Sequence, residues 1–87
     1  MANTKSAEKR IRQAEKRRVR NRYHRSRMRT AVKRLRGLIE EGKSAEARET
    51  LQGTLGLIDA TAQKGVIHRN AAARTKSRLT LAVNNLD

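Results

Sequence analysis

Proline is absent from all 87 residues, so no position is barred from the interior of a helix. Alanine, leucine, arginine, glutamate and lysine, which are strong helix formers, recur throughout. Gly42 and Gly65 each follow a stretch of helical period and predict two helix ends. We therefore expect an all-α fold of one domain over residues 1–87, a three-helix up-down-up bundle with helices at about 5–41, 44–63 and 67–86.

The first predicted helix has two unlike halves. Its second half carries an apolar stripe at helical spacing, formed by Met28, Ala31, Val32, Leu35, Leu38 and Ile39. Its first half, which follows a cap at Asn3, Thr4 or Ser6, offers only Ile11, Val19 and Tyr23. A helix of roughly 35 residues would be about 50 Å long, so we expect a long basic first helix whose amino-terminal half projects from the bundle.

The second predicted helix follows EGKS, with Ser44 expected as its N-cap. Its apolar stripe consists of Ala47, Leu51, Leu55, Ile58 and Ala62. Gly53 and Gly56 oppose this pattern, because a glycine costs about 1 kcal/mol relative to alanine in a helix interior. Two explanations stay open: another helix approaches closely there, or the helix is irregular.

Several function classes are disfavoured by what the sequence lacks. Cysteine is absent, and His24 and His68 lie too far apart to form a metal-ligand pattern. No nucleophile with its base and no glycine-rich phosphate loop stands out, so we expect no enzyme, cofactor or small-molecule substrate. No apolar run is long enough for a signal peptide or a membrane span. The basic start also fits a mitochondrial transit peptide, but Glu8, Glu15 and basic residues beyond position 30 oppose that interpretation.

The charge is distributed unevenly along the chain, whose net charge is +14. Residues 1–36 contain 15 basic and 2 acidic side chains, residues 37–63 contain 2 and 5, and residues 64–87 contain 5 and 1. Arginine dominates the first segment, and its guanidinium matches phosphate by bidentate hydrogen bonding. We interpret the two ends of the chain as a nucleic-acid surface rather than as ordinary solvated faces.

Like charges repeat four residues apart in the first helix, as at Lys16 and Arg20 or at Arg18 and Arg22. Each such pair costs about 0.2–0.5 kcal/mol in an isolated helix. We therefore predict that roughly the first 25 residues are frayed in the free protein and become helical when phosphates neutralise the repulsion.

The stretch KGVIHRNAAARTKSRL, residues 64–79, mixes alanines with spaced cations. On a helical wheel, the side expected to face the bundle holds Ala71, Ala72, Thr75, Leu79, Ala82, Val83 and Leu86. The outward side holds small or polar residues, namely Asn70, Ala73, Ser77, Thr80 and Asn84. Cations flank this side, with Arg69 and Lys76 on one shoulder and Arg74 and Arg78 on the other.

This wheel predicts a face against which a nucleic-acid backbone can lie between two rows of cations. Asn70 and Ser77 would donate hydrogen bonds between the rows. The first amide N–H groups of the helix, near His68 to Asn70, are expected to form an anion site. His68 itself is more typical of a cap than of a catalytic group.

Tyr23 is the only aromatic residue, so binding is expected to use backbone and shape rather than stacking. A leucine-zipper DNA reader is disfavoured, because the apolar stripe lasts about three turns before Gly42. Two rivals remain: a DNA-compacting or transcriptional basic protein, and a membrane-active cationic helix. The second needs an exposed apolar face that the first 25 residues lack.

Two segments resemble the bacterial small-subunit ribosomal protein number twenty family, which also occurs in plastids. One is the start, MANTKSAEKRIRQAEKRRVRNR, through Met1-Ala2-Asn3, Lys5-Ser6-Ala7 and Lys9-Arg10, with Arg29-Thr30 beyond it. The other is the stretch at 64–79, through Lys64-Gly65, Ile67-His68, Asn70, Ala72-Ala73-Arg74 and Lys76 to Leu79. The likeness covers essentially the whole chain.

The resemblance implies a structural constituent of the small ribosomal subunit that binds 16S ribosomal RNA directly and stabilises packed RNA helices through phosphate contacts. It implies a monomer in the cytoplasmic or plastid ribosome, touched only peripherally by other ribosomal proteins. Together with the wheel, it predicts RNA contacts at Lys5, Lys9, Arg10, Arg12, Lys16, Arg17, Arg18, Arg20, Arg22, Arg25, Arg27, Arg29, Lys64, His68, Arg69, Asn70, Arg74, Lys76, Ser77 and Arg78.

Overall fold

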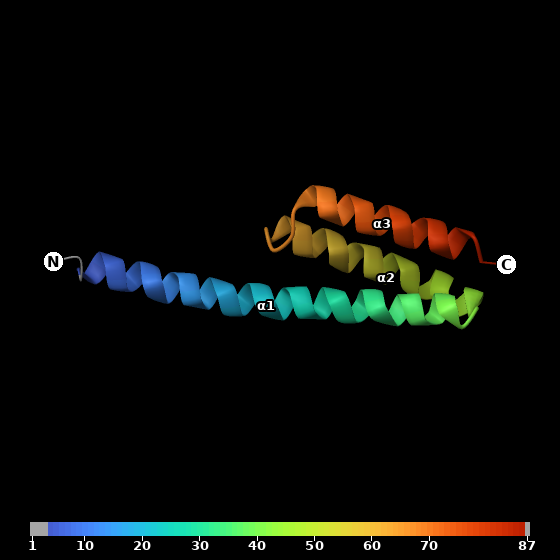
Figure 1. Cartoon of the computed structure of the whole chain (residues 1–87), viewed down its shortest axis with the longest axis horizontal. Helices are drawn as coiled ribbons and strands as arrows, with labels where there is room; N and C mark the ends of the chain where they lie inside the picture. The colour runs from blue at the N-terminus through green and yellow to red at the C-terminus, as the bar shows by residue number, and fades with distance from the viewer. Residues whose placement is uncertain (1–3, 87) are drawn as a thin grey trace.

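A computed structural model of the chain describes residues 4–86. It contains three helices, α1 (Lys5–Glu40), α2 (Ser44–Gln63) and α3 (Arg69–Asn84), and no strand within that range. Figure 1 shows α2 lying between α1 and α3 and running antiparallel to both. The up-down-up helical bundle predicted from the sequence is confirmed, and so is the long first helix.

Both helix ends predicted at a glycine are confirmed, and both glycines lie in the left-handed region. Gly42 has φ of 72° and Gly65 has φ of 75°, a conformation that glycine adopts without a Cβ clash. After α1, the N–H of Gly42 donates to the carbonyl of Ile39 and that of Lys43 to the carbonyl of Leu38. This pair of bonds is a Schellman motif, and it recurs after α2 around Gly65.

The helix caps agree with the sequence expectation at α1 and α3 and differ from it at α2. Thr4 caps α1, with its hydroxyl oxygen accepting from the N–H of Ala7 at 3.3 Å. Ser44, expected to be an N-cap, is instead the first residue of α2, and Lys43 occupies the cap position without a side-chain hydrogen bond. The expectation was wrong because the tight turn at Gly42 leaves a single residue before the next helix begins. His68 caps α3.

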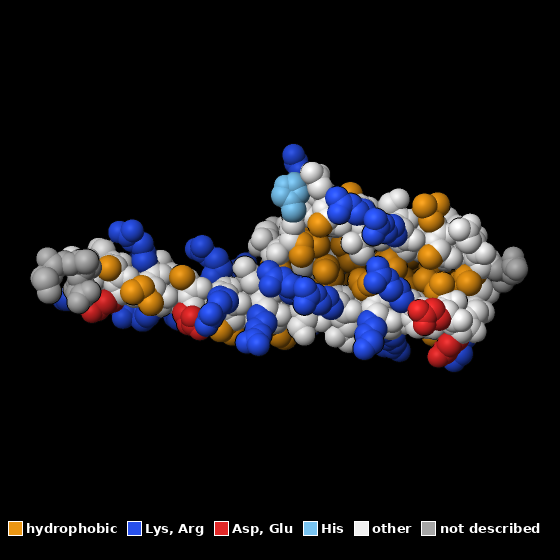
Figure 2. Space-filling model, in the orientation of Figure 1, with side chains coloured by type: hydrophobic (Ala, Val, Ile, Leu, Met, Phe, Trp, Pro, Cys, Tyr) orange, Lys and Arg blue, Asp and Glu red, His pale blue; other side chains and the backbone are white. Residues whose placement is uncertain are grey.

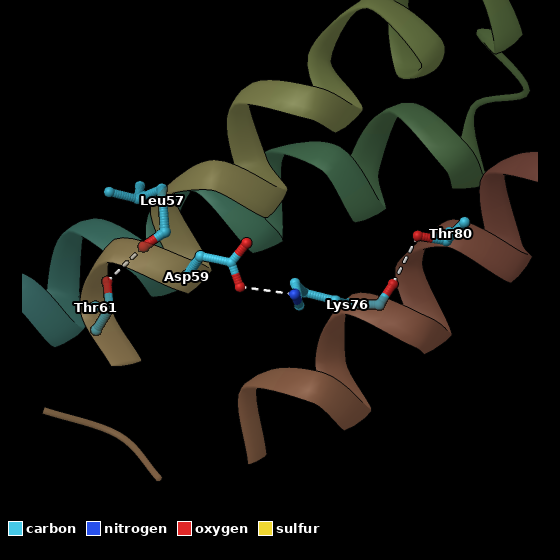
Figure 3. Close-up of polar contacts among 5 residues, drawn as sticks. All are labelled: Leu57, Asp59, Thr61, Lys76 and Thr80. Atoms are coloured by element: carbon cyan, nitrogen blue, oxygen red, sulfur yellow. Dashed lines mark hydrogen bonds and ion pairs between the residues drawn. The ribbon is translucent and has the colours of Figure 1, made fainter. Parts of the chain in front are cut away.

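The hydrophobic core lies in the second half of α1, in α2 and α3, and in the turn between them, where Val66 is buried. Its buried members are Val32, Leu35, Ala47, Leu51, Ile58, Ala72, Leu79 and Val83. Thr54 and Thr61 are also buried, although the apolar stripe omitted them. The hydroxyl of Thr54 donates to the carbonyl of Thr50, and that of Thr61 to the carbonyl of Leu57 (Figure 3), in each case one turn earlier. Burying them is therefore tolerated, because each hydroxyl has a partner.

Gly53 and Gly56 fit neither explanation left open by the sequence. α2 is continuous through both positions. A Cβ atom added at either residue would meet nothing within 4 Å. The helix is therefore regular there, and no neighbouring backbone requires the glycines.

The first part of α1 projects beyond α2 and α3 (Figure 1). We call residues 5–27 the arm, and its last turns, from Arg20 onward, lie beside α2 and the turn that follows it. None of its residues is buried, and Ile11, Val19 and Tyr23 are 69%, 59% and 57% exposed. The molecule is 65 Å long, with a radius of gyration of 17.6 Å, whereas a compact chain of this length would have about 12 Å. The predicted projection of the basic half is confirmed.

Candidate nucleic-acid interface

The arm presents basic side chains in every direction around its axis. Figure 2 shows Lys and Arg side chains along both visible edges of α1, with few acidic groups between them. Glu15 accepts from Arg18 at 2.7 Å, an ion pair whose side chains are 58% and 76% exposed. An exposed pair of this kind contributes about 0–1 kcal/mol. The arm therefore keeps most of its positive field available to a polyanion.

The turn between α2 and α3 rests against the base of the arm. The guanidinium of Arg20 donates to the carbonyl of Lys64 at 3.3 Å. Burial, then the positive charges of Lys64, Arg20 and Arg27, lower the pKa of His24 from its usual 6.5. His24 is therefore largely neutral at pH 7. These contacts join two segments that are 44 residues apart in the sequence into one cationic junction.

Tyr23 lies beside this junction and is packed by charged and polar neighbours. The guanidinium carbon of Arg27 lies 5.9 Å from the centre of the Tyr23 ring. The ring of His24 meets it edge-on, with 5.2 Å between centroids. A cation at this distance is attracted by the face of the ring, so Tyr23 orients Arg27.

At the start of α3, the predicted anion site is partly occupied by the protein itself. The Nδ1 atom of His68 accepts a hydrogen bond from the N–H of Asn70 at 3.0 Å. That amide is consequently not available to an external anion in this conformation. The expectation of a cap at His68 is confirmed, and the anion site loses one of its expected donors.

The outward side of α3 matches most of the wheel. Asn70, Ala73, Ser77 and Asn84 are exposed, as expected. Thr80 differs, because it is half-buried and its hydroxyl donates to the carbonyl of Lys76 at 2.8 Å (Figure 3). Ala71, placed on the buried side by the wheel, is exposed. A front of small residues therefore exists, although it is shorter than predicted.

One of the two predicted rows of cations is altered by a contact between helices. The Nζ of Lys76 lies 2.7 Å from the Oδ1 of Asp59 on α2 (Figure 3), and its side chain is 34% exposed. Lys76, predicted to be a cation on this shoulder and an RNA contact, therefore already has an acidic partner within the protein. A wheel drawn for α3 alone has no information on the charge that α2 places beside it.

The other row, on the α1 side of α3, faces cations that the sequence analysis missed. Arg78 and Arg36 line one hollow between α1 and α3. Arg36 also lines a neighbouring hollow with Arg29 and Lys33, so the two hollows are continuous. We call this continuous feature the α1–α3 groove. Lys33 and Arg36 were overlooked because they flank the apolar stripe of α1. Their spacing from Arg29, four and seven residues, was the available signal.

Other site types find no support in the structure. Residues 4–86 contain no group of three or more His, Cys, Asp or Glu side chains able to hold a metal ion. Among the helices that the structure describes, none is both long and apolar enough to span a membrane.

Comparison with known proteins gives one consistent result. A family model for ribosomal protein S20 matches residues 2–84. A protein of Aquifex aeolicus named small ribosomal subunit protein bS20 is 50% identical over 84 residues, covering 97% of this chain and 89% of that protein. Proteins of the same name from Thiobacillus denitrificans and Geotalea uraniireducens are 48% and 51% identical over 86 residues, covering 99% of each chain. The chain therefore belongs to the ribosomal protein S20 family.

Proposed function

We propose that this protein is a structural constituent of the small ribosomal subunit, in the cytoplasmic ribosome, and that it binds 16S ribosomal RNA directly. The observation that carries the proposal is the exposed cationic arm, whose charge is balanced only by Glu8 and Glu15. The relatives compared above are named small ribosomal subunit proteins, and these names indicate the assembly in which we place this chain. The role is one of binding and support rather than catalysis.

The proposed mechanism is electrostatic. Each Lys or Arg that meets a phosphate releases a condensed counterion, which favours binding at low salt. Because the arm carries cations on all sides, RNA segments can approach it from several directions at once. Packed RNA helices that would otherwise repel one another are then held together by the shared arm.

The α3 end of the interface contributes positioning contacts. Lys64, Arg69, Arg74 and Arg78 supply cations, while Ser77 leaves space for the RNA backbone to approach. Lys76 exchanges its contact with Asp59 for a phosphate only at a small cost, because the pair is partly exposed. The protein acts as a single domain and as a monomer, with other ribosomal proteins at its periphery.

Binding measurements with two nucleic acids test the proposal. We expect tight, selective binding to folded 16S RNA over duplex DNA of equal length. With 6–10 phosphate contacts, affinity should fall by about 10³–10⁵-fold between 50 and 200 mM salt. Equal affinity for the DNA would contradict the proposal and favour a DNA-compacting protein.

A further inference from the structure

The α1–α3 groove exists because of how the helices pack. α1 and α3 are each packed mainly against α2 and meet one another in few places. Figure 2 shows exposed apolar side chains between two sets of basic side chains, one over α1 and the other over α3. The hollows that form the groove measure about 620 Å³ and 290 Å³, and they share Arg36 and Glu40.

The walls and the floor of the groove differ in chemistry. Arg29, Lys33 and Arg36 line it from α1, and Arg78 lines it from α3. Within residues 4–86 none of these four cations forms an ion pair with an acidic side chain. The floor is apolar and includes Met28, Ile39 and Ala82, which are half-buried. Glu40 is the one acidic residue in the lining, and it lies near the end of α1.

This arrangement suits a strand that carries anions along its edges and flat, weakly polar groups between them. An unpaired RNA strand has that pattern, with phosphates outside and riboses and bases inside. A duplex would rest on the rims without reaching the floor, because its bases are already stacked and paired. The apolar floor thus supplies a surface for bases that the scarcity of aromatic residues otherwise denies the protein.

We propose that the α1–α3 groove holds one unpaired RNA strand, with phosphates on Lys33, Arg36 and Arg78 and bases over the apolar floor. This inference rests on the proposed function, because the strand belongs to the RNA bound by the arm. Cations continue along α1 from Arg25 through Arg29 into the groove without an intervening acid. That continuity favours RNA over an acidic protein helix, the other occupant of matching charge.

Two helix glycines provide a matched test. Gly37 lines the groove, whereas Gly56 lies exposed on α2. A Cβ at either position meets nothing within 4 Å, so Gly37→Leu and Gly56→Leu should both fold, each with one fewer helix-weakening glycine. We expect Gly37→Leu to weaken binding to 16S RNA by about tenfold or more, the scale of one lost stacked base, and Gly56→Leu to bind within about twofold of the parent.

Equal affinities of Gly37→Leu and the parent for 16S RNA would overturn the proposal and favour a protein partner as the occupant of the groove. Equal losses in both variants would also overturn it, since the effect would then not belong to the groove. Failure of the parent itself to bind 16S RNA is a distinct result, which contradicts the proposed function and removes this inference with it. Circular dichroism checks that both variants are folded.

Cross-linking identifies the kind of RNA in the groove. The chain has no cysteine, so Gly37→Cys and Gly56→Cys each create a single attachment point for a short photoactivated cross-linker. Cross-links from Gly37→Cys should fall on nucleotides that are unpaired in the RNA secondary structure. They should be lost when Lys33→Gln and Arg36→Gln are added to the same chain. Cross-links confined to duplex nucleotides would overturn the proposal.

Discussion

The arm and the packed half of the molecule are both helical, but burial in a core stabilises the helix in only one of them. The arm, residues 5–27, contains no buried side chain, whereas residues 28–86 contain the whole hydrophobic core. Burial stabilises the second region within the protein, and like-charge repulsion weakens the first. Folding and RNA binding should therefore be separable by mutation, because each depends mainly on one region.

Neutralising the arm should have the largest effect on binding. Replacing Arg10, Arg12, Arg17, Arg18 and Arg22 with glutamine removes up to five phosphate contacts. Affinity for 16S RNA should fall by about 10³-fold near physiological salt, and the slope of log affinity against log salt should become shallower by up to about 4.5. Filter binding at several salt concentrations measures both quantities. The midpoint of urea unfolding should not fall, and a large loss of stability would contradict the separation of the two regions.

In the packed half, two leucines of α3 form a matched pair. Leu79 is 2% exposed and Leu81 is 59% exposed. Leu79→Ala should lower the free energy of unfolding by about 2–5 kcal/mol, and Leu81→Ala by less than about 0.5 kcal/mol. Urea unfolding followed by circular dichroism gives both values. Similar losses for the two variants would show that α3 packs in another orientation.

Ser77→Leu tests whether the exposed front of α3 contacts RNA. Ser77 is exposed, so the fold should be preserved, but the larger side chain should keep the RNA backbone away. We expect a loss of affinity of about tenfold, the scale of one or two lost contacts. Ser77→Ala is the control and should bind within about threefold of the parent. Unchanged binding by Ser77→Leu would show that RNA does not lie on this face.

The smallest expected effect is a dependence of binding on pH through His24. In the free fold its pKa lies below 6.5 because of burial and nearby cations. The folded protein therefore becomes less stable as pH falls below 6.5, because the unfolded chain binds the proton more readily. Bound phosphates would raise the pKa again, and binding should therefore take up a proton. Affinity should rise by roughly threefold between pH 7.5 and 5.5, and His24→Gln should remove that part of the rise. The same pH profile in parent and variant would show that phosphates do not lie near His24.

Much of the fold could be predicted because its determinants are local. Gly42 and Gly65 mark the turns by their own conformation. The apolar stripe of α1 begins at Met28, directly after the arm, so the projection of the arm also follows from sequence. The N-cap at Ser44 was wrong by one residue, because cap position depends on the geometry of the preceding turn.

The site was less predictable, because its features depend on how the helices face one another. The contact between Lys76 and Asp59 joins α2 to α3, and the α1–α3 groove joins Arg36 to Arg78. A wheel for one helix contains neither relation. Most arm cations are different, because they lie on the part of α1 that projects beyond α2 and α3 and their exposure follows from sequence alone.

Hydrogen exchange of backbone amides, measured with and without 16S RNA, tests the difference between the two regions most directly. In the free protein, the amides of the arm should exchange rapidly, whereas those around Leu35, Ile58 and Leu79 should be protected by core packing. Adding RNA should protect the arm strongly and change the core little. Arm amides that are as protected as the core before RNA is added would contradict the account.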